Sequence, residues 1–224
     1  LYKSFVVGEC VVTNARTAEM AKLTENASRD VSIAFANELS LICDELDIDV
    51  WKLIELANRH PRVNILQPGP GVGGHCIAVD PWFIINKTPE QSPLIHAARK
   101  VNDGKPQWVV KKVEQEVQRF LQDHPQKKIE DVTVACFGLA FKPDIDDLRE
   151  SPALDITKQL AANNDFKVVA VEPNVESLKA DFDLVTLDTA FAEADVYVLL
   201  VDHKPFKQFK PACEYVVDTK GCWF

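Results

Sequence analysis

The sequence predicts an α/β protein in two parts: a helical first half, followed by a Rossmann-like, doubly wound parallel sheet. Two observations lead to this prediction. Residues 16–46 contain neither proline nor glycine, and their apolar residues recur at helical spacing. From residue 132 onward, short β-branched and aromatic runs alternate with helical segments, which is the pattern of parallel strands joined by crossover helices.

The first helix, predicted over residues 16–46, would span roughly 45 Å at ~1.5 Å per residue. Such a length indicates a helix that bridges domains or forms an oligomer interface. A loop rich in glycine and proline follows at residues 67–74, and Asp80 and Pro81 are expected to begin a helix as its N-cap and first residue. Further helices are predicted at residues 50–58, 94–102 and 108–121.

A break between the last two of these helices is expected at Gly104 and Pro106, because both residues disfavour a helix interior. The linker is therefore placed at residues 102–106, which divides the chain into domains at 1–105 and 106–224. Ligands of doubly wound sheets bind beyond the carboxyl ends of the strands, so the loops there are the expected site. The strands are predicted at 132–137, 167–171, 184–187, 196–201 and 215–218, with helices at 152–162 and 189–194.

The composition of the 224 residues, 46% hydrophobic and 26% charged, is typical of a soluble globular protein. A net charge of -9 argues against nucleic acid as the main partner. The six cysteines are dispersed without metal-ligand spacing, so we expect no metal site and no disulfide scaffold, but reduced thiols in the cytoplasm. No apolar run is long enough to cross a membrane, and the first residues indicate a fragment rather than a signal peptide.

The first candidate site surrounds Cys76, which follows the glycine loop and precedes the helix expected at Asp80. A helix N-terminus favours the thiolate, and glycines allow the backbone to approach a ligand closely. A buried cysteine beside an ordinary tight turn is an equally open alternative.

A second candidate group shares one face of the first predicted helix. Lys22, Asn26 and Arg29 are spaced at i, i+4 and i+7, and such a group could hold an oxyanion or a phosphate. On spacing alone, a solvated polar stripe is the more common explanation. His60, next to a proline, is by itself more typical of a surface residue.

The segment after the first predicted strand lies where a nucleotide site is expected. However, the residues from Gly138 to Ala140 do not form a GxGxxG fingerprint, so a dinucleotide site is not predicted here. Glu172 has the ribose-binding position of a Rossmann unit, but a lone acid carries little weight.

Together these stretches resemble the nucleotide-sugar dehydrogenase family that includes the UDP-glucose dehydrogenases. Val72 and Val79 replace an aromatic residue and a lysine of the UDP-glucose enzymes, and the sequence is most similar to the branch acting on UDP-N-acetyl-D-mannosamine. The resemblance is carried by residues 18–26, 58–63, 68–82, 137–143 and 149–152.

The resemblance implies an NAD-dependent, two-hydride oxidation of the sugar 6-hydroxyl, giving UDP-N-acetyl-D-mannosaminuronic acid. Cys76 matches the nucleophile, which holds the substrate as a thiohemiacetal and then as a thioester. Lys22 and Asn26 match the pair that stabilises the oxyanion and positions water, and Asp80 matches an acid that helps activate this water. The positions that match substrate contacts are Lys22, Asn26, Arg29, His60, Arg62, Gly73, Phe141, Lys142 and Lys220.

The resemblance also implies a bacterial, cytoplasmic enzyme of surface-polysaccharide biosynthesis, such as that of enterobacterial common antigen. We expect a homodimer formed through helix 16–46, in which Arg62 reaches the neighbouring subunit's site. Arg149 matches a contact to NAD, but the main NAD site belongs to an N-terminal GxGxxG domain that is missing here, so the isolated chain is expected to be inactive. The alternatives are a non-catalytic UDP-sugar-binding and dimerisation module, or a dehydrogenase of another UDP-hexose such as UDP-glucose.

Overall fold

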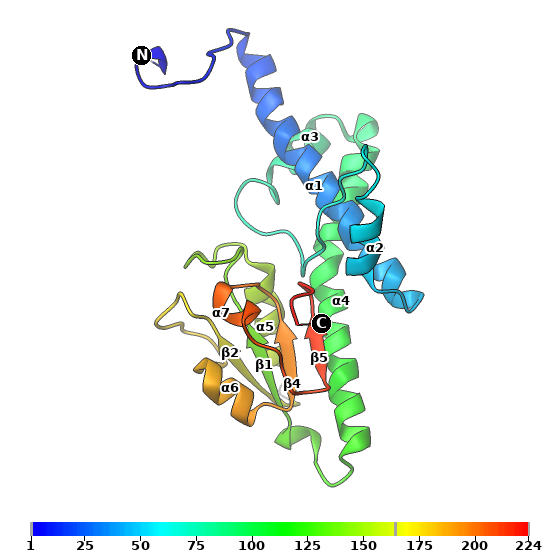
Figure 1. The fold of residues 1–224 in the computed structure, drawn as a ribbon. Coiled ribbons are helices and arrows are strands. Elements are labelled where there is room, and N and C mark those ends of the chain that lie inside the picture. Colours follow the sequence, from blue (N-terminus) through cyan, green and yellow to red (C-terminus); the bar gives the residue numbers. More distant parts are fainter. Residues whose placement is uncertain (1, 164, 224) are drawn as a thin grey trace.

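The computed structural model of the chain describes residues 2–163 and 165–223. A helical part and an α/β part share one long helix, α4, which runs alongside both (Figure 1). No helix in the described ranges combines the length and apolarity that a membrane crossing requires. The elements are α1 Ala15–Glu45, α2 Val50–Ala57, α3 Asp80–Lys87, α4 Pro93–Asp123, β1 Thr133–Phe137, α5 Pro152–Ala162, β2 Lys167–Val171, β3 Asp183–Leu184, α6 Leu187–Glu193, β4 Val196–Leu199, α7 Lys204–Lys207 and β5 Val216–Asp218, with short 3-10 helices at Tyr2–Ser4, Pro89–Gln91 and Ile129–Asp131.

The helical part is organised around α1, which packs against α3 and α4. Its start is capped by Asn14, whose side chain accepts a hydrogen bond from the backbone N–H of Thr17. Asp49 caps α2 in the same way. The long helix and the short helix after it were therefore predicted correctly, to within a residue or two at their ends.

The expected break at Gly104 and Pro106 was wrong, because α4 continues through both residues. Buried anchors lie on either side of them, Asn102 before and Val109 after, and packing at helical spacing outweighs the local propensity of two residues. The ring of Pro106 also packs against the loop, since a Cβ on Gly71 would lie 3.2 Å from its Cγ. The domain boundary predicted between residues 105 and 106 stays a prediction, at a point inside this helix.

The second half is a parallel sheet of order β3-β2-β1-β4-β5. Successive strand residues face opposite sides. Cys136 and Val198 therefore pack with α4 and α5, whereas Phe137 and Leu199 pack with α6 and α7. Helices thus cover both faces, which confirms the predicted doubly wound fold; the short helix α7 was not predicted.

Candidate active site

A cavity of about 410 Å³ lies at the carboxyl edge of the sheet, between the two parts of the chain. We call it the edge cavity. One wall comes from Arg29 and Ile33 of α1, and another from residues 67–73, the glycine loop. The segments after β1, β4 and β5 complete it. The strand order reverses between β1 and β4, so the cavity has the position that ligands take in doubly wound sheets.

Basic side chains predominate among the charged groups of the edge cavity. Arg29, Lys142 and Lys220 line it together with a single acid, Asp202. Asp202 lies 2.6 Å from the Lys207 Nζ and 3.5 Å from the Lys220 Nζ. Burial alone would raise the pKa of Asp202, but the hydrogen bond from Lys207 and the charge of Lys220 outweigh burial, so the pKa is lowered. The remaining positive charge suits a phosphorylated ligand.

The glycine loop approaches the α/β part so closely that side chains are excluded. A Cβ on Gly73 would lie 2.4 Å from the carbonyl oxygen of Glu150 and 3.1 Å from the Cβ of Phe141. Gly71 has a φ of 152°, and a Cβ there would lie 3.0 Å from the Cβ of Pro152. Gly73 and Phe141, both predicted substrate contacts, therefore meet at the edge cavity, where the loop contacts the protein's own backbone.

Cys76 is exposed and lies in the turn that leads from the glycine loop to α3. Its carbonyl oxygen accepts hydrogen bonds from the N–H groups of Val79, at 3.2 Å, and Asp80, at 2.8 Å. The alternative of a buried cysteine was wrong. Cys76 does not line the edge cavity itself, but its neighbour Ile77 does.

Four of the five other cysteines lie in less reactive surroundings; the fifth, Cys10, is half-buried in the segment before α1. Burial raises the pKa of Cys136 to about 12, and burial also raises the pKa values of Cys43, Cys213 and Cys222. Since the thiolate is the nucleophile, burial makes these four thiols less reactive, whereas Cys76 is exposed next to the edge cavity.

Two of the residues predicted to be catalytic contact each other. The Nδ2 of Asn26, on α1, donates to the Oδ2 of Asp80 at 2.5 Å, which ties α1 to the start of α3. Asp80 is the first residue of α3 and its N-cap is Val79, so the expected capping role of Asp80 was wrong. Its carboxylate turns to Asn26 instead. Lys22, one turn earlier on α1, is exposed and pairs with Glu25 at 3.1 Å.

Like Lys22, Asn26, Cys76 and Asp80, three further predicted site residues do not line the edge cavity. His60 and Arg62 are exposed beyond the end of α2, and the backbone N–H of Arg62 donates to the Nδ1 of His60 at 3.3 Å. Arg149 is also exposed and makes two parallel hydrogen bonds to Asp147, whose pKa this pairing lowers. Their assigned roles stay predictions.

Glu172, at the carboxyl end of β2, occupies the groups that a dinucleotide would use. Its Oε2 accepts hydrogen bonds from the backbone N–H groups of Leu139, at 2.7 Å, and Ala140, at 3.0 Å. The same oxygen contacts the buried Nε2 of His203 at 3.1 Å. Burial alone would raise the pKa of Glu172, but these hydrogen bonds lower it to about 2. The carboxylate therefore binds the loop after β1 and does not face a ribose.

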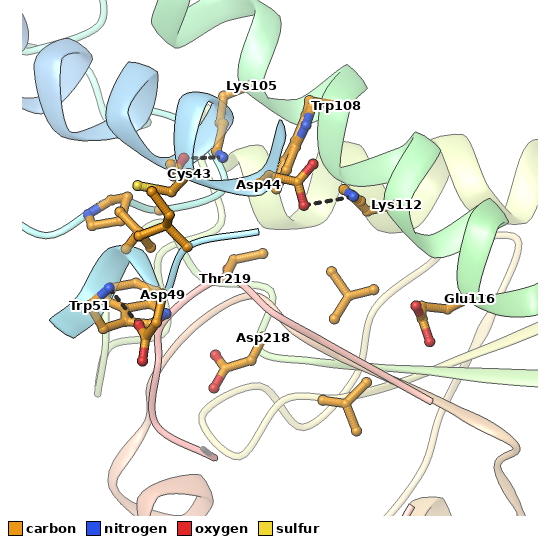
Figure 2. Close-up of a pocket in the computed structure, with 17 residues that line it drawn as sticks. Cys43, Asp44, Asp49, Trp51, Lys105, Trp108, Lys112, Glu116, Asp218 and Thr219 are labelled. Carbon is orange, nitrogen blue, oxygen red and sulfur yellow. Dashed lines mark hydrogen bonds and ion pairs between the residues drawn. The ribbon is translucent and has the colours of Figure 1, made fainter. Parts of the chain in front are cut away.

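A second cavity, of about 320 Å³, lies between the end of α1, the start of α2, α4 and β5 (Figure 2). Lys105 is buried at its edge, donates to the Oγ of Ser40 at 2.6 Å, and lies 3.6 Å from the ring centre of Trp108. Burial lowers the pKa of Lys105 to about 7. The sequence prediction missed both Lys105 and Asp202, because a lone charged residue carries no motif. Within the described residues, no group of three or more His, Cys, Asp or Glu side chains is arranged to hold a metal ion.

Two family models match the chain in the order of its two parts. The central domain of the UDP-glucose/GDP-mannose dehydrogenase family matches residues 16–104, and the UDP-binding domain of the same family matches residues 135–224.

Individual relatives agree with these matches. The chain is 63% identical to a UDP-N-acetyl-D-mannosamine dehydrogenase of Yersinia pestis, over all of this chain and 54% of that protein. Its structure is similar to that of a UDP-D-ManNAc dehydrogenase from Pyrococcus horikoshii, with a TM-score of 0.85 and 34% identity over 99% of this chain and 52% of the other. For a UDP-N-acetyl-mannosamine dehydrogenase of Staphylococcus aureus, the TM-score is 0.81 and the identity 43%, over 99% and 51%. The chain spans about half the length of these relatives, and it belongs to the UDP-glucose/GDP-mannose dehydrogenase family.

Proposed function

We propose that this chain supplies the substrate site and the catalytic cysteine of an NAD-dependent dehydrogenase. The reaction is the oxidation of UDP-N-acetyl-D-mannosamine to UDP-N-acetyl-D-mannosaminuronic acid. One observation carries the proposal: the basic edge cavity adjoins the glycine loop that leads to the exposed Cys76. Arg29, Lys142 and Lys220 suit the pyrophosphate of a nucleotide sugar. The names of the relatives support the choice of sugar.

In the proposed reaction, Cys76 forms a covalent bond to C6 of the sugar. The 6-hydroxyl is first oxidised to the aldehyde, and the Cys76 thiolate adds to its carbon to give a thiohemiacetal. A second oxidation converts this adduct to a thioester. Water then attacks C6, the C–S bond breaks, and the carboxylic acid and the free thiol are released.

Asn26, Asp80 and Lys22 are proposed to serve the charged steps. The Asp80 carboxylate accepts a proton from the attacking water, while the Asn26 amide holds this carboxylate at the start of α3. The ammonium group of Lys22 stabilises the oxyanion that develops on C6. Lys22 is exposed, and its contact with the equally exposed Glu25 lies at the surface, so the ammonium group can turn toward a bound substrate.

The described residues do not fit a dinucleotide. Glu172 occupies the N–H groups after β1, and Arg149 is an exposed side chain already paired with Asp147. We therefore place the main NAD site on a domain outside this chain, from where NAD supplies the acceptor for both hydrides. By itself, the chain is proposed to bind UDP-sugar without turnover.

The proposed assembly is a cytoplasmic homodimer formed through α1. Several large apolar side chains on this helix are exposed, which a single core face does not explain. A two-fold axis would bury them against the same helix of a second copy, and would bring Arg62 toward the neighbouring site. The exposed side chains are Met20, Phe35 and Ile42, with Leu46 at the helix end.

The test is product analysis with a protein that joins this chain to an N-terminal NAD-binding domain. UDP-N-acetyl-D-mannosamine should yield the uronic acid and two molecules of NADH per sugar. UDP-glucose should react at least about tenfold more slowly, a discrimination of ~1.4 kcal/mol. Preference for UDP-glucose would overturn the choice of sugar, and absence of NADH with every UDP-sugar would overturn the dehydrogenase itself.

A further inference from the structure

Side chains, rather than the backbone, hold the segment between α2 and α3. In the part of the chain that the structure describes, residues 64–75 take part in no backbone–backbone hydrogen bond. Buried polar backbone groups need partners, and in this segment side chains supply several of them. Asn58 does so at the start, where its amide exchanges hydrogen bonds of 2.7 and 2.9 Å with the backbone of Ile65.

Two further asparagines hold this segment, and both belong to α1. Asn26 holds Asp80 at the end of the segment, and the Oδ1 of Asn37 accepts the N–H of Gly69 at 2.9 Å in its middle. Asn26 and Asn37 lie about three helical turns apart, so they share one face of α1. A single helix thus holds the chain at two points, at Gly69 before Cys76 and at Asp80 after it.

The orientation of the Asn37 amide is determined by a chain of hydrogen bonds. Asn37 is fully buried, and its Nδ2 donates to the Oδ1 of Asn102 at 2.9 Å. The Nδ2 of Asn102 in turn donates to the carbonyl oxygen of Asp30 at 3.1 Å and to its Oδ1 at 2.8 Å. A carbonyl oxygen can only accept, so Asn102 must present its oxygen to Asn37, and Asn37 must present its oxygen to Gly69.

We propose that Asn37 is a positioning residue, which sets the glycine loop in place for the reaction at Cys76. The inference rests on the proposed function of the edge cavity, whose wall includes Gly69. A Cβ on Gly69 would lie 3.7 Å from the Nζ of Lys220, so a shift at this point changes the space beside a proposed phosphate ligand. The same shift is passed along the loop toward Cys76.

Replacement of Asn37 by alanine leaves the buried N–H of Gly69 without its acceptor. We expect hydrogen exchange at residues 69–76 to accelerate at least about tenfold, with α1 and α4 unchanged. The rate of Cys76 alkylation by iodoacetamide should change at least about threefold. The effect on the reaction is measured in a protein that joins this chain to the NAD-binding domain, at a temperature well below the melting temperature of the variant. Under these conditions kcat/KM for the UDP-sugar should fall at least about tenfold.

Ser40→Ala is the matched control. Ser40 lies one turn further along α1 and is also buried. Its hydroxyl bonds to Lys105 and to the carbonyl of Asn37, and none of the hydrogen bonds between described residues joins it to the glycine loop. Its loss should lower the melting temperature but leave loop exchange, alkylation rate and kcat/KM within about twofold. Asn102→Ala frees the Asn37 amide to rotate and should change the three readouts in the same direction as Asn37→Ala. It provides the test if Asn37→Ala does not fold.

The two proposals can fail separately. If the parent protein oxidises no UDP-sugar, the proposed function is wrong, while the exchange and alkylation measurements still decide the role of Asn37. If exchange at residues 69–76 is unchanged in both Asn37→Ala and Asn102→Ala, or if Ser40→Ala accelerates it equally, the positioning role is overturned.

Discussion

The two ends of α4 lie in interiors of opposite character. Its first half packs against α1 through buried polar side chains. Among them, Arg99 pairs with Asp30 of α1 at 2.6 Å. Its second half faces the sheet with valines and Phe120. An apolar core stabilises the fold without fixing the orientation of individual groups, whereas a hydrogen-bonded interior fixes the orientation of each group. The polar interior adjoins the loop proposed to carry the chemistry, and the apolar interior supports the proposed nucleotide-binding part.

The largest expected effect belongs to Cys76, on the side of the polar interior. Cys76→Ser should reduce formation of the uronic acid by at least about 1000-fold, because a hydroxyl does not replace the thiolate in the thioester. Binding of UDP-sugar should stay within about threefold. Product analysis and calorimetry on the same preparation check both halves of this prediction, with Cys213→Ser as the control thiol. Uronic acid formation at the parental rate would contradict the role of Cys76.

The next prediction compares one residue from each interior. Asp30→Ala removes the buried carboxylate that pairs with Arg99 and leaves only the half-exposed Asp103 beside this guanidinium, among the described residues. It should lower the free energy of unfolding by about 3–5 kcal/mol. Ile156→Ala in the sheet core should cost about 2–5 kcal/mol. Despite similar losses of stability by urea unfolding, only Asp30→Ala should accelerate hydrogen exchange at residues 69–76. Equal acceleration in both variants would mean that the polar interior has no special connection to the loop.

The change of stability with pH in the alkaline range should reveal the burial of the Lys105 amine. Burial lowers its pKa to about 7, from 10.5 in the unfolded chain. Between these two pKa values the unfolded state binds more protons than the folded state, so the free energy of unfolding rises with pH. Below pH 7 the Lys105 amine is protonated in both states and does not change the free energy of unfolding with pH. Relative to Lys105→Met, the parent should gain up to about 1.4 kcal/mol per pH unit from pH 7 to 10.5. Parallel unfolding curves for the two proteins over this range would contradict the burial of Lys105.

The smallest expected effect is on affinity, in the α/β part. Lys220→Ala removes a cation from the edge cavity and should weaken UDP binding about tenfold, as expected for one charge-assisted hydrogen bond of ~1.5 kcal/mol. Lys204→Ala is the matched control, since Lys204 is exposed near the same edge but does not line the cavity. Equal weakening in both variants would indicate a general effect of net charge, and no specific contact by Lys220.

The sequence predicts the apolar interior far better than the polar one. The strand at Lys167–Val171 and the helix at Pro152–Ala162 have the predicted bounds, because apolar runs between turn residues determine both. In contrast, the break at Pro106 and the capping role of Asp80 were wrong. Both failures come from partners distant in the sequence: Gly71 packs on the Pro106 ring, and Asn26 binds the Asp80 carboxylate.

The candidate site shows the same division. Motif resemblance indicated Lys142 and Lys220, and the structure brings both to one cavity. Asp202 and Asn37 could not be found in this way, because a single acid or amide acquires its role only from the groups that folding places beside it.

The central proposal is that this chain binds UDP-sugar, and that its described residues form no dinucleotide site. Calorimetric titration of the 224-residue chain tests it most directly. UDP-N-acetyl-D-mannosamine should bind with one ligand per site at micromolar to millimolar affinity, about 4–8 kcal/mol, and Lys220→Ala should weaken it. NAD should give no saturable heat over the same range. Saturable binding of NAD, or no binding of the UDP-sugar, would contradict the account.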